Sequence, residues 1–505
     1  MKIRNLKFKT LILFLGIGWT LNSQAQITWP PVLPHSDKNG VAVLKSADLL
    51  KVPASIQQVL DANPEIKLDI AKHIPKVELV YHNELNNAAI NGTGWSSWGD
   101  ICLASDGRVY SGIGNHWKTD RGESYIYSWD PARSVLKKVA DINQSNGAKA
   151  NDVHFSKVHA HIIEGRDKKI YFTGTLDDGS KAGHDEMLSK WTPNIAGGKL
   201  LQYDPVSGKT IVYADFPAAR VTATTKYDRV RNILYAEIEG DPKGVALGAF
   251  DMATKKWIFQ SESGVISHHR DMMMDKQGNI YFNGKQNKIS DQMVLRGGVY
   301  YPAAKKADST STSMLPPDQS DRLKNIPVTE LWKYSPETRS IQATKSASIG
   351  GIRSSTRESK AGYIYGTTMG NQLFRYSPAK DELTILGSNF LKNGEYITVC
   401  DLSKDEKYVY YLPGAHGSAG FSGTPVIQYE IASGKQKAIA FLSEPMVNAF
   451  NYAPGGTYGL KISDDGSKLY VGLNGSPPDA LRPKGLGRGF GLTSFAIIHI
   501  PAEER

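Results

Sequence analysis

Cysteine is almost missing from this chain, which has only Cys102 and Cys400 among its 505 residues. A protein of this length with so few cysteines is held together by its hydrophobic core and not by a framework of disulfides. Long apolar runs are also missing, because after residue 21 no stretch approaches the roughly 20 residues that a transmembrane helix needs. We therefore expect no transmembrane segment, and either about three ordinary domains or one large repeat fold.

The N-terminus has the organisation of a secretion signal. Four cations precede an apolar stretch over residues 12–21, and Ser23-Gln24-Ala25 is a small-x-small cleavage site. The cations are Lys2, Arg4, Lys7 and Lys9. We expect a signal peptide over residues 1–25 and an exported protein, either periplasmic or secreted.

Positive charge is in moderate excess. The chain has 60 Lys and Arg against 50 Asp and Glu, so the net charge falls from +10 to +6 once the four signal cations are removed. A basic exported protein suits an anionic partner such as an acidic polysaccharide or oligosaccharide. Nucleic acid is a poor candidate outside the cytoplasm, and we expect a monomer.

One short pattern recurs seven times: an apolar run, a turn rich in Asp, Gly and Lys, and an apolar pair ending in tyrosine. The copies are ASDGRVYSG, GRDKKIYFTG, DRVRNILYAE, DKQGNIYFNG, SKAGYIYGTT, SKDEKYVYYL and SDDGSKLYVG, with tyrosines Tyr110, Tyr171, Tyr235, Tyr281, Tyr365, Tyr410 and Tyr470. An aromatic strand follows each copy, as in QYDPVSGK. Short strands and turns at this period predict an all-β fold, a seven-bladed β-propeller with one four-stranded sheet per repeat.

The last repeat has no fourth strand of its own, because the chain ends soon after Ile500. Residues 77–82 are the expected donor, so that the propeller would be closed by an N-terminal strand pairing with residues 494–500. Residues 47–62 have helical spacing and predict a short helix outside the ring, although Pro53 weakens this prediction. We expect a signal peptide (1–25), an N-terminal extension with this helix and strand (26–93), and the propeller (94–505).

Aligning the repeats identifies one face of the propeller. The stretch before each repeat tyrosine aligns without gaps, so the position twelve residues upstream should lie beside the central channel in every blade. It holds Trp98, His159, Ala223, His269, Arg353, Thr398 and Tyr458. The position six residues after the tyrosine includes His116 and His416. Antiparallel neighbours bring both positions to the same end of the channel, where histidines, an arginine and a tyrosine should gather.

The longest connections leave the same face. They join the second and third strands of blades two and four, over residues 172–202 and 282–333, and the second of them is rich in lysine and arginine. Long loops and cations around a histidine-rich channel mouth indicate a cleft for an extended anionic ligand. The alternative is that long surface loops are simply charged.

The residue types at this mouth suit one reaction in particular. No nucleophile elbow, phosphate loop or zinc-finger pattern is present. Histidine, tyrosine and arginine together suit the elimination of a C4 substituent from a uronic acid, in which the proton at C5 is removed. Such a site must neutralise the adjacent carboxylate, supply a base at C5 and protonate the leaving oxygen.

Two segments strengthen this interpretation by resemblance. FSKVHAHIIEGRDKKIYFTGT, with YSGIGNH upstream and the repeated [QR]Y[DS]P turns, resembles the secreted seven-bladed lyases of the ulvan-lyase type, polysaccharide lyase families 24 and 25, and more distantly the oligogalacturonate lyases. The resemblance covers about residues 94–500. It implies β-elimination at C4–C5 of uronic acid residues in an acidic, sulfated algal-type polysaccharide or its oligosaccharides, or elimination of water from a chain-end uronate by a dehydratase.

The resemblance also suggests roles for individual residues. His159 of KVHAH matches a catalytic histidine best, and His116 of GNHW is second. Tyr458 is the mouth tyrosine by register, and Arg220 or Arg353 would neutralise the carboxylate. Trp98 and His269 are candidate substrate-binding residues. His161, two residues beyond His159, is expected only to form hydrogen bonds.

Two further possibilities stay open. His269, His416 and Cys400 are weak candidates for a structural divalent metal such as zinc, since relatives hold a metal near this channel and imidazole is a common ligand. The protein could also be a non-catalytic propeller of the cell envelope that binds anionic glycan or protein.

Overall fold

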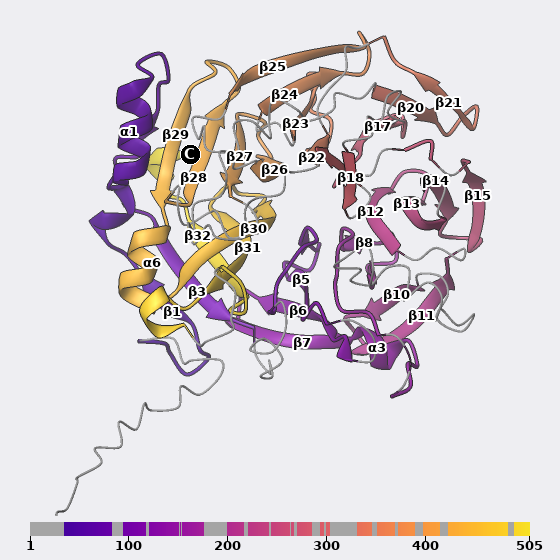
Figure 1. Ribbon diagram of the computed structural model, residues 1–505, viewed down its shortest axis with the longest axis horizontal. Helices are drawn as coiled ribbons and strands as arrows, with labels where there is room; N and C mark the ends of the chain where they lie inside the picture. Colours follow the sequence, from indigo (N-terminus) through magenta and orange to yellow (C-terminus); the bar gives the residue numbers. More distant parts are fainter. Residues whose placement is uncertain are drawn as a thin grey trace, which may run out of the picture.

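The computed structural model describes residues 35–82, 94–117, 121–150, 152, 154–175, 199–216, 221–241, 244–262, 264–266, 270–284, 293–296, 299–302, 331–345, 351–368, 372–388, 397–414, 423–482 and 489–505. Seven sheets of four or five strands in this part of the chain are arranged in a ring about a central axis (Figure 1). The chain is a seven-bladed β-propeller, as the repeat predicts.

Each blade follows the predicted order of strands from the channel outward. Blade one consists of β4 (Cys102–Leu103), β5 (Val109–Gly114), β6 (Ser124–Asp130) and β7 (Val135–Asp141). Blade two consists of β8 (Ile163–Glu164), β9 (Ile170–Thr173), β10 (Lys199–Asp204) and β11 (Lys209–Asp215). Blade three consists of β12 (Val221–Asp228), β13 (Ile233–Asp241), β14 (Gly244–Asp251) and β15 (Lys256–Gln260).

The next three blades repeat this order. Blade four consists of β16 (Met273–Met274), β17 (Ile280–Asn283), β20 (Leu331–Ser335) and β21 (Ser340–Ala343). Blade five consists of β22 (Ile352–Ser355), β23 (Ile364–Thr368), β24 (Gln372–Ser377) and β25 (Glu382–Ser388). Blade six consists of β26 (Ile397–Leu402), β27 (Tyr408–Pro413), β28 (Pro425–Glu430) and β29 (Gln436–Phe441). Blade seven begins with β30 (Ala453–Ile462), β31 (Lys468–Ser476) and β32 (Ser494–His499).

Short elements lie between or after these strands in the described part of the chain. They are the helices α3 (Ile142–Ser145) and α6 (Ser443–Phe450), the 3-10 turns η4 (Asp479–Leu481) and η5 (Ala502–Glu504), and the hairpin β18 (Met293–Arg296) and β19 (Val299–Pro302). Among the described residues no helix is both long enough and apolar enough to span a membrane.

The repeat tyrosine is a core residue in every blade. All seven lie in second strands and are buried. In blades two and four the tyrosine hydroxyl donates to the aspartate of the preceding turn, with 2.9 Å between Tyr171 Oη and Asp167 Oδ2 and 2.9 Å between Tyr281 Oη and Asp275 Oδ2. Since a buried hydroxyl needs a partner, these contacts link the turn to the tyrosine in these two blades.

Aromatic rings also join neighbouring blades. The ring of Tyr110 in blade one lies 6.1 Å from that of Tyr203 in blade two, and Tyr281 in blade four lies 5.0 Å from Tyr376 in blade five. Such pairs contribute about 0.5–1.5 kcal/mol beyond the area they bury. Tyr203 and Tyr376, the aromatic residues of two third strands, therefore stabilise contacts between sheets as well as their own sheets.

The N-terminal extension lies outside the ring. Residues 47–62 form the 3-10 turn η1 (Ala47–Leu50) and the helix α1 (Ala54–Ala62), separated at Pro53, which is the N-cap of α1. Proline has no N–H to donate within a helix, so a break at this position is expected. The helix packs on blade six through the buried Ile56 (Figure 1).

The predicted pairing of the N-terminal strand is confirmed. The strand β3 (Lys76–Tyr81) runs antiparallel to β32, with Val77 opposite Ile498 and Tyr81 opposite Ser494. It is the fourth strand of the blade-seven sheet. Two shorter strands extend the sheets further: β1 (Ala42–Leu44) pairs with β3, and β2 (Asp69–Ile70) pairs in parallel with β29.

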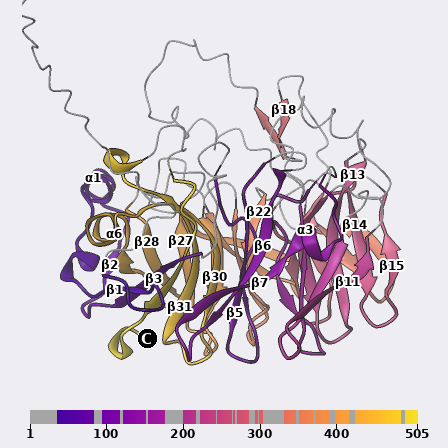
Figure 2. The ribbon, with the colours of Figure 1, turned by 90° about the horizontal axis from the view of Figure 1, so that it is seen from below.

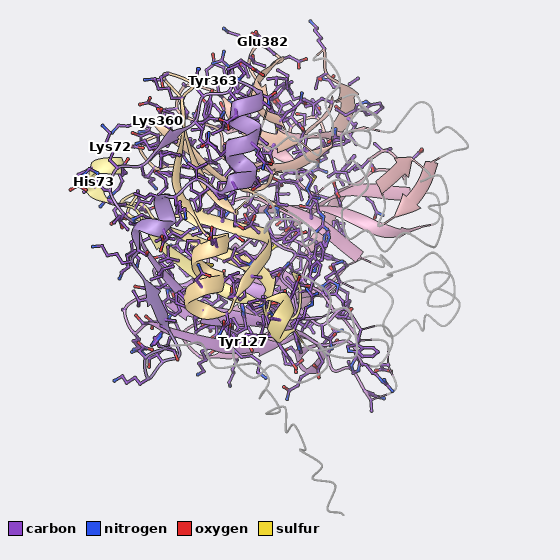
Figure 3. The ribbon with its side chains drawn as sticks, turned by 60° about the vertical axis from the view of Figure 1, so that its left-hand side comes forward. Lys72, His73, Tyr127, Lys360, Tyr363 and Glu382 are labelled. Carbon is purple, nitrogen blue, oxygen red and sulfur yellow. The ribbon has the colours of Figure 1, made fainter. Side chains whose placement is uncertain are left out.

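A buried carboxylate joins these N-terminal strands to the C-terminus. Glu504 accepts hydrogen bonds from the backbone N–H groups of Lys72 (2.6 Å) and His73 (3.0 Å) and from Lys437 Nζ (2.8 Å). Figure 3 shows Lys72 and His73 beside η5. Burial alone would raise the pKa of Glu504, but these hydrogen bonds outweigh it and lower the pKa to about 2. We name these four residues the terminal clasp.

The prediction that the repeats align without gaps is wrong by one residue. The repeat tyrosines Tyr110, Tyr171 and Tyr281 pair with Cys102, Ile163 and Met273, eight residues upstream, whereas Tyr235, Tyr410 and Tyr470 pair with Lys226, Asp401 and Lys461, nine upstream. The first hairpin of a blade therefore contains an odd number of connecting residues in some blades and an even number in others. Residues at the same distance before the repeat tyrosine therefore do not occupy the same position on the inner strand in every blade.

The two faces of the ring differ. Figure 2 shows β18 above one face and the C-terminus at the other. The chain reaches β18 from the end of β17, the second strand of blade four. The equivalent end of β5, at Gly114, therefore points to the β18 face, and so do the residues that follow it.

Candidate functional site at the channel mouth

His116 is held in a specific conformation just beyond β5. The side chain of Asn115 accepts hydrogen bonds from the backbone N–H groups of Trp117 (3.1 Å) and Glu123 (3.0 Å), which organises the following loop. His116 has a φ of 58°, in the left-handed region that few non-glycine residues adopt. Its N–H donates to the carbonyl of Ser156 in blade two (3.1 Å). Backbone strain of this kind is often concentrated at functional sites.

The indole of Trp98 is the centre of the site. Its ring lies 5.3 Å from the imidazole of His116, 4.6 Å from the ring of Tyr458 and 6.0 Å from the ring of Phe490, to which it is nearly parallel. Blades one and seven thus bring together Trp98, His116 and Tyr458, which the sequence predicts for one end of the channel.

Two cations lie against the same indole. Lys157 Nζ is 4.7 Å from the ring centroid, and the guanidinium carbon of Arg270 is 5.2 Å from it. Arg270 Nη1 also donates to the carbonyl oxygen of Trp98 (3.4 Å). Because Trp98 belongs to blade one and Arg270 to blade four, this contact spans the channel. We name Trp98, His116, Lys157, Arg270, Tyr458 and Phe490 the mouth cluster.

His159 lies next to this cluster. A β-carbon at Gly99, the neighbour of Trp98, would be 2.6 Å from the carbonyl oxygen of Ala160 and 3.4 Å from the carbonyl carbon of His159. Only glycine therefore allows the two segments to approach so closely. His159 is 8% exposed and follows Lys157 by two residues.

Among the other predicted residues, Arg353 is buried on β22, the inner strand of blade five. Its neighbour Ile352 pairs with Thr368 at the end of β23 and donates to Asn283 Oδ1 at the end of β17 (3.0 Å), so Arg353 lies at the predicted end of the channel. Arg220, His269 and His416 lie outside the described residues. Their predicted roles remain expectations.

Sequence reasoning missed Lys157, Arg270 and Phe490. Lys157 could have been found by strand periodicity, because it precedes His159 by two residues and so shares its side of an extended segment. Arg270 directly follows His269, so a shift of one residue in the alignment would have selected it. Phe490 lies in the long connection of blade seven, where no repeat gives a register.

Deeper in the channel lies a set of paired charges, which we name the ion ring: Asp100, His161, Lys226, Asp271, Asp401 and Lys461. Asp271 is 3.0 Å from Lys226 Nζ and 3.5 Å from His161 Nε2, and it accepts a hydrogen bond from Ser355 Oγ (2.8 Å). Lys461 donates to Asp100 across the junction of blades seven and one. His161 thus contacts a carboxylate, and its predicted role stays a prediction.

Burial and pairing shift the ionisation of the ring in different directions. Burial lowers the pKa of His161, which favours the neutral imidazole although Asp271 opposes this. Burial would also lower the pKa of Lys461, but Asp100 and Asp401 raise it. The pKa of Asp401 is raised by burial. The ring is therefore a compensated network in which each lysine has a carboxylate beside it.

Cys400 is a buried thiol. Its Sγ is 3.5 Å from Ser354 Oγ, and burial raises the pKa of the thiol to about 12. Among the described residues no three His, Cys, Asp or Glu side chains are grouped to hold a metal ion, and both cysteines are free thiols.

Comparisons with known proteins find similarity only in solved structures. No protein-family model matches the chain, and no curated protein does. The structure described as U3-55K is 12% identical, covers 84% of this chain and 98% of its own, and gives a TM-score of 0.46. The RRP9 WD40 repeats are 11% identical, cover 84% and 97%, and give a TM-score of 0.45.

Proposed function

We propose that the protein is a carbohydrate-active lyase that catalyses β-elimination at C4–C5 of a uronic acid residue in an acidic glycan. One observation carries the proposal: a histidine, a tyrosine and two cations from four different blades converge on Trp98 at the channel mouth. These are the residue types that remove a proton beside a carboxylate and stabilise the charge that develops.

The cations of the mouth cluster have a natural role in this reaction. As the C5 proton leaves, negative charge spreads onto the carboxylate, and a cation fixed in place stabilises this charge without reorganising. Arg270 spans the channel and is the best placed of the described cations to meet a sugar there. Arg220 and Arg353 remain the predicted alternatives for this role.

We assign the proton transfers of this reaction to His159, His116 and Tyr458. His159 is the favoured acid–base residue because of the KVHAH resemblance and because its backbone approaches Gly99, the neighbour of Trp98, with His116 or Tyr458 assisting. A chain-end dehydratase would use the same groups, because only the leaving group at C4 changes. A sulfated algal-type polysaccharide, or an oligosaccharide derived from it, is the substrate class that the resemblance favours.

A second candidate function is binding without catalysis. The nearly parallel rings of Trp98 and Phe490 suit the apolar face of a sugar, and Lys157 and Arg270 suit its anionic groups. A propeller that uses this surface only to capture glycan at the cell envelope would need no acid or base.

Product formation separates the two functions. The wild-type protein is incubated with uronate-containing glycans, and the conjugated C4–C5 double bond is followed by its ultraviolet absorbance. We expect product from the wild type and a loss of about 10²–10⁴-fold in His159→Ala. The control is His73→Ala at the terminal clasp, which should keep normal activity. Absence of product from every uronate glycan, with retained binding, would favour the second function.

A further inference from the structure

The hydroxyl of Ser96 lies between two rings of the mouth cluster. Ser96 Oγ is 2.5 Å from His116 Nε2 and 2.6 Å from Trp98 Nε1. Backbone hydrogen bonds fix Ser96 opposite Gly114, with 3.0 Å between the N–H of each residue and the carbonyl of the other. The residue is 1% exposed, so substrate cannot reach the hydroxyl and Ser96 cannot serve as a nucleophile.

Counting donors and acceptors determines the direction of both hydrogen bonds. The indole N–H of Trp98 can only donate, so Ser96 Oγ accepts from it. The hydroxyl proton of Ser96 then needs an acceptor, and among the described residues His116 Nε2 is the one within hydrogen-bond distance. A buried donor without an acceptor is unfavourable, so the hydroxyl donates to Nε2. A neutral imidazole that accepts at Nε2 carries its proton on Nδ1.

We propose that Ser96 is a positioning residue that holds neutral His116 in the tautomer protonated at Nδ1. The inference rests on the proposed function in so far as it assigns a role in β-elimination. Because Nε2 is occupied by the Ser96 hydroxyl and Nδ1 already carries a proton, neutral His116 is a hydrogen-bond donor and not the base. The base at C5 is then His159 or Tyr458, and not His116.

Nitrogen NMR of the whole protein labelled with ¹⁵N-histidine tests this tautomer without any substrate. The His116 signals are identified by their loss in His116→Ala, and two-bond proton–nitrogen correlations show which ring nitrogen carries the proton. We expect Nδ1–H in the wild type and loss of this fixed tautomer in Ser96→Ala. Nε2–H in the wild type, or an unchanged tautomer in Ser96→Ala, would overturn the proposal.

Two further variants separate the hydroxyl from general packing. Ser96→Thr keeps the hydroxyl and should keep the Nδ1–H tautomer. Trp98→Phe removes the donor to Ser96 but leaves the hydroxyl proton with the same acceptor, so it should also keep the tautomer. Loss of the tautomer in folded Ser96→Thr, or its dependence on Trp98 alone, would count against the role of Ser96.

Activity provides an independent readout. In Ser96→Ala we expect kcat to fall about 10²-fold with little change in KM, at the lower end of what loss of an acid–base group costs, and Ser96→Thr should restore it. If the wild type forms no unsaturated product while the tautomer follows Ser96, the proposed elimination fails and the positioning inference stands. If product forms but the tautomer does not depend on Ser96, the proposed elimination stands and the positioning inference fails.

Discussion

The mouth cluster and the ion ring both place cations in the channel, but they hold them in different ways. In the ion ring, Lys226 and Lys461 each donate to a carboxylate, Asp271 and Asp100 respectively. In the mouth cluster, Lys157 and Arg270 lie against the indole of Trp98. A carboxylate neutralises the charge of a cation, whereas an aromatic face attracts the cation and leaves its charge in place.

This difference indicates what each level of the channel is for. A paired buried charge satisfies the fold, because removing one partner leaves the other charge desolvated without compensation. We therefore assign the ion ring to the stability of the propeller. For the mouth cluster, where cations gather with the aromatic rings of Trp98, Tyr458 and Phe490, ligand recognition is our proposal.

The largest effect is expected from Asp271→Asn. The substitution removes the carboxylate that faces Lys226 and His161, and loss of one partner of a buried pair costs about 3–5 kcal/mol. Urea unfolding measures the free energy. Asp61→Asn, on the exposed side of α1, is the matched control and should change little. Equal stability of the two variants would contradict the structural role of the ion ring.

The terminal clasp tests the same pairing rule outside the channel. The pKa of Glu504 is about 2 in the folded protein and about 4.5 without its partners, so the clasp stabilises the fold above about pH 4.5 and loses this effect as the pH falls towards 2. At neutral pH Glu504→Gln should therefore cost up to about 3 kcal/mol. Urea unfolding at neutral and acid pH should show the difference from wild type disappearing in acid. A difference in the free energy of unfolding that is the same at neutral and acid pH would contradict the stabilising role of ionised Glu504.

Substitutions in the mouth cluster should separate binding from stability. Lys157→Met keeps most of the side chain and removes the charge, so the free energy of unfolding should change by less than about 1 kcal/mol. Affinity for a uronate oligosaccharide should fall about 10- to 100-fold, as expected when a charged hydrogen bond is lost. Calorimetric titration measures the affinity. Arg270→Gln should behave in the same way, and normal affinity in both variants would remove the mouth cluster as the recognition site.

The smallest effect is expected where no buried cation is involved. Tyr281→Phe removes a hydroxyl that donates to Asp275, while Asp275 still accepts from the backbone N–H (2.8 Å) and the side chain (2.7 Å) of Asn279. We expect a loss of about 1 kcal/mol in the free energy of unfolding. A loss as large as that of Asp271→Asn would mean that pairing with a cation is not what distinguishes the ion ring.

Repetition made much of the fold predictable. Seven tyrosines with their turns define seven blades, and the missing fourth strand of the last blade points to residues 77–82, which pair with β32. Side-chain detail at the channel was harder to predict, because a change of one residue in a hairpin moves the following positions. Tyr110 pairs with Cys102 and Tyr235 with Lys226, and because of this shift His161 was the one member of the ion ring that the sequence singled out.

The mouth cluster was predicted in part for the same reason. Trp98 and Tyr458 were found by register and His116 by its place after β5, whereas Arg270 reaches Trp98 from across the ring. Contacts across a channel join residues far apart in sequence, and no local pattern encodes them. No sequence pattern identifies Ser96, because its proposed role depends on its hydrogen bonds with the rings of His116 and Trp98.

The most direct test of the central claim compares one oligosaccharide in two forms. A uronate oligosaccharide and its carboxyl-reduced, neutral form are titrated into the wild-type protein and into Arg270→Gln. If the cations of the mouth cluster recognise an anionic sugar, the wild type binds the uronate form and loses most of its affinity for the reduced form, and Arg270→Gln weakens binding of the uronate form alone. Equal affinity of the wild type for both forms would contradict the account.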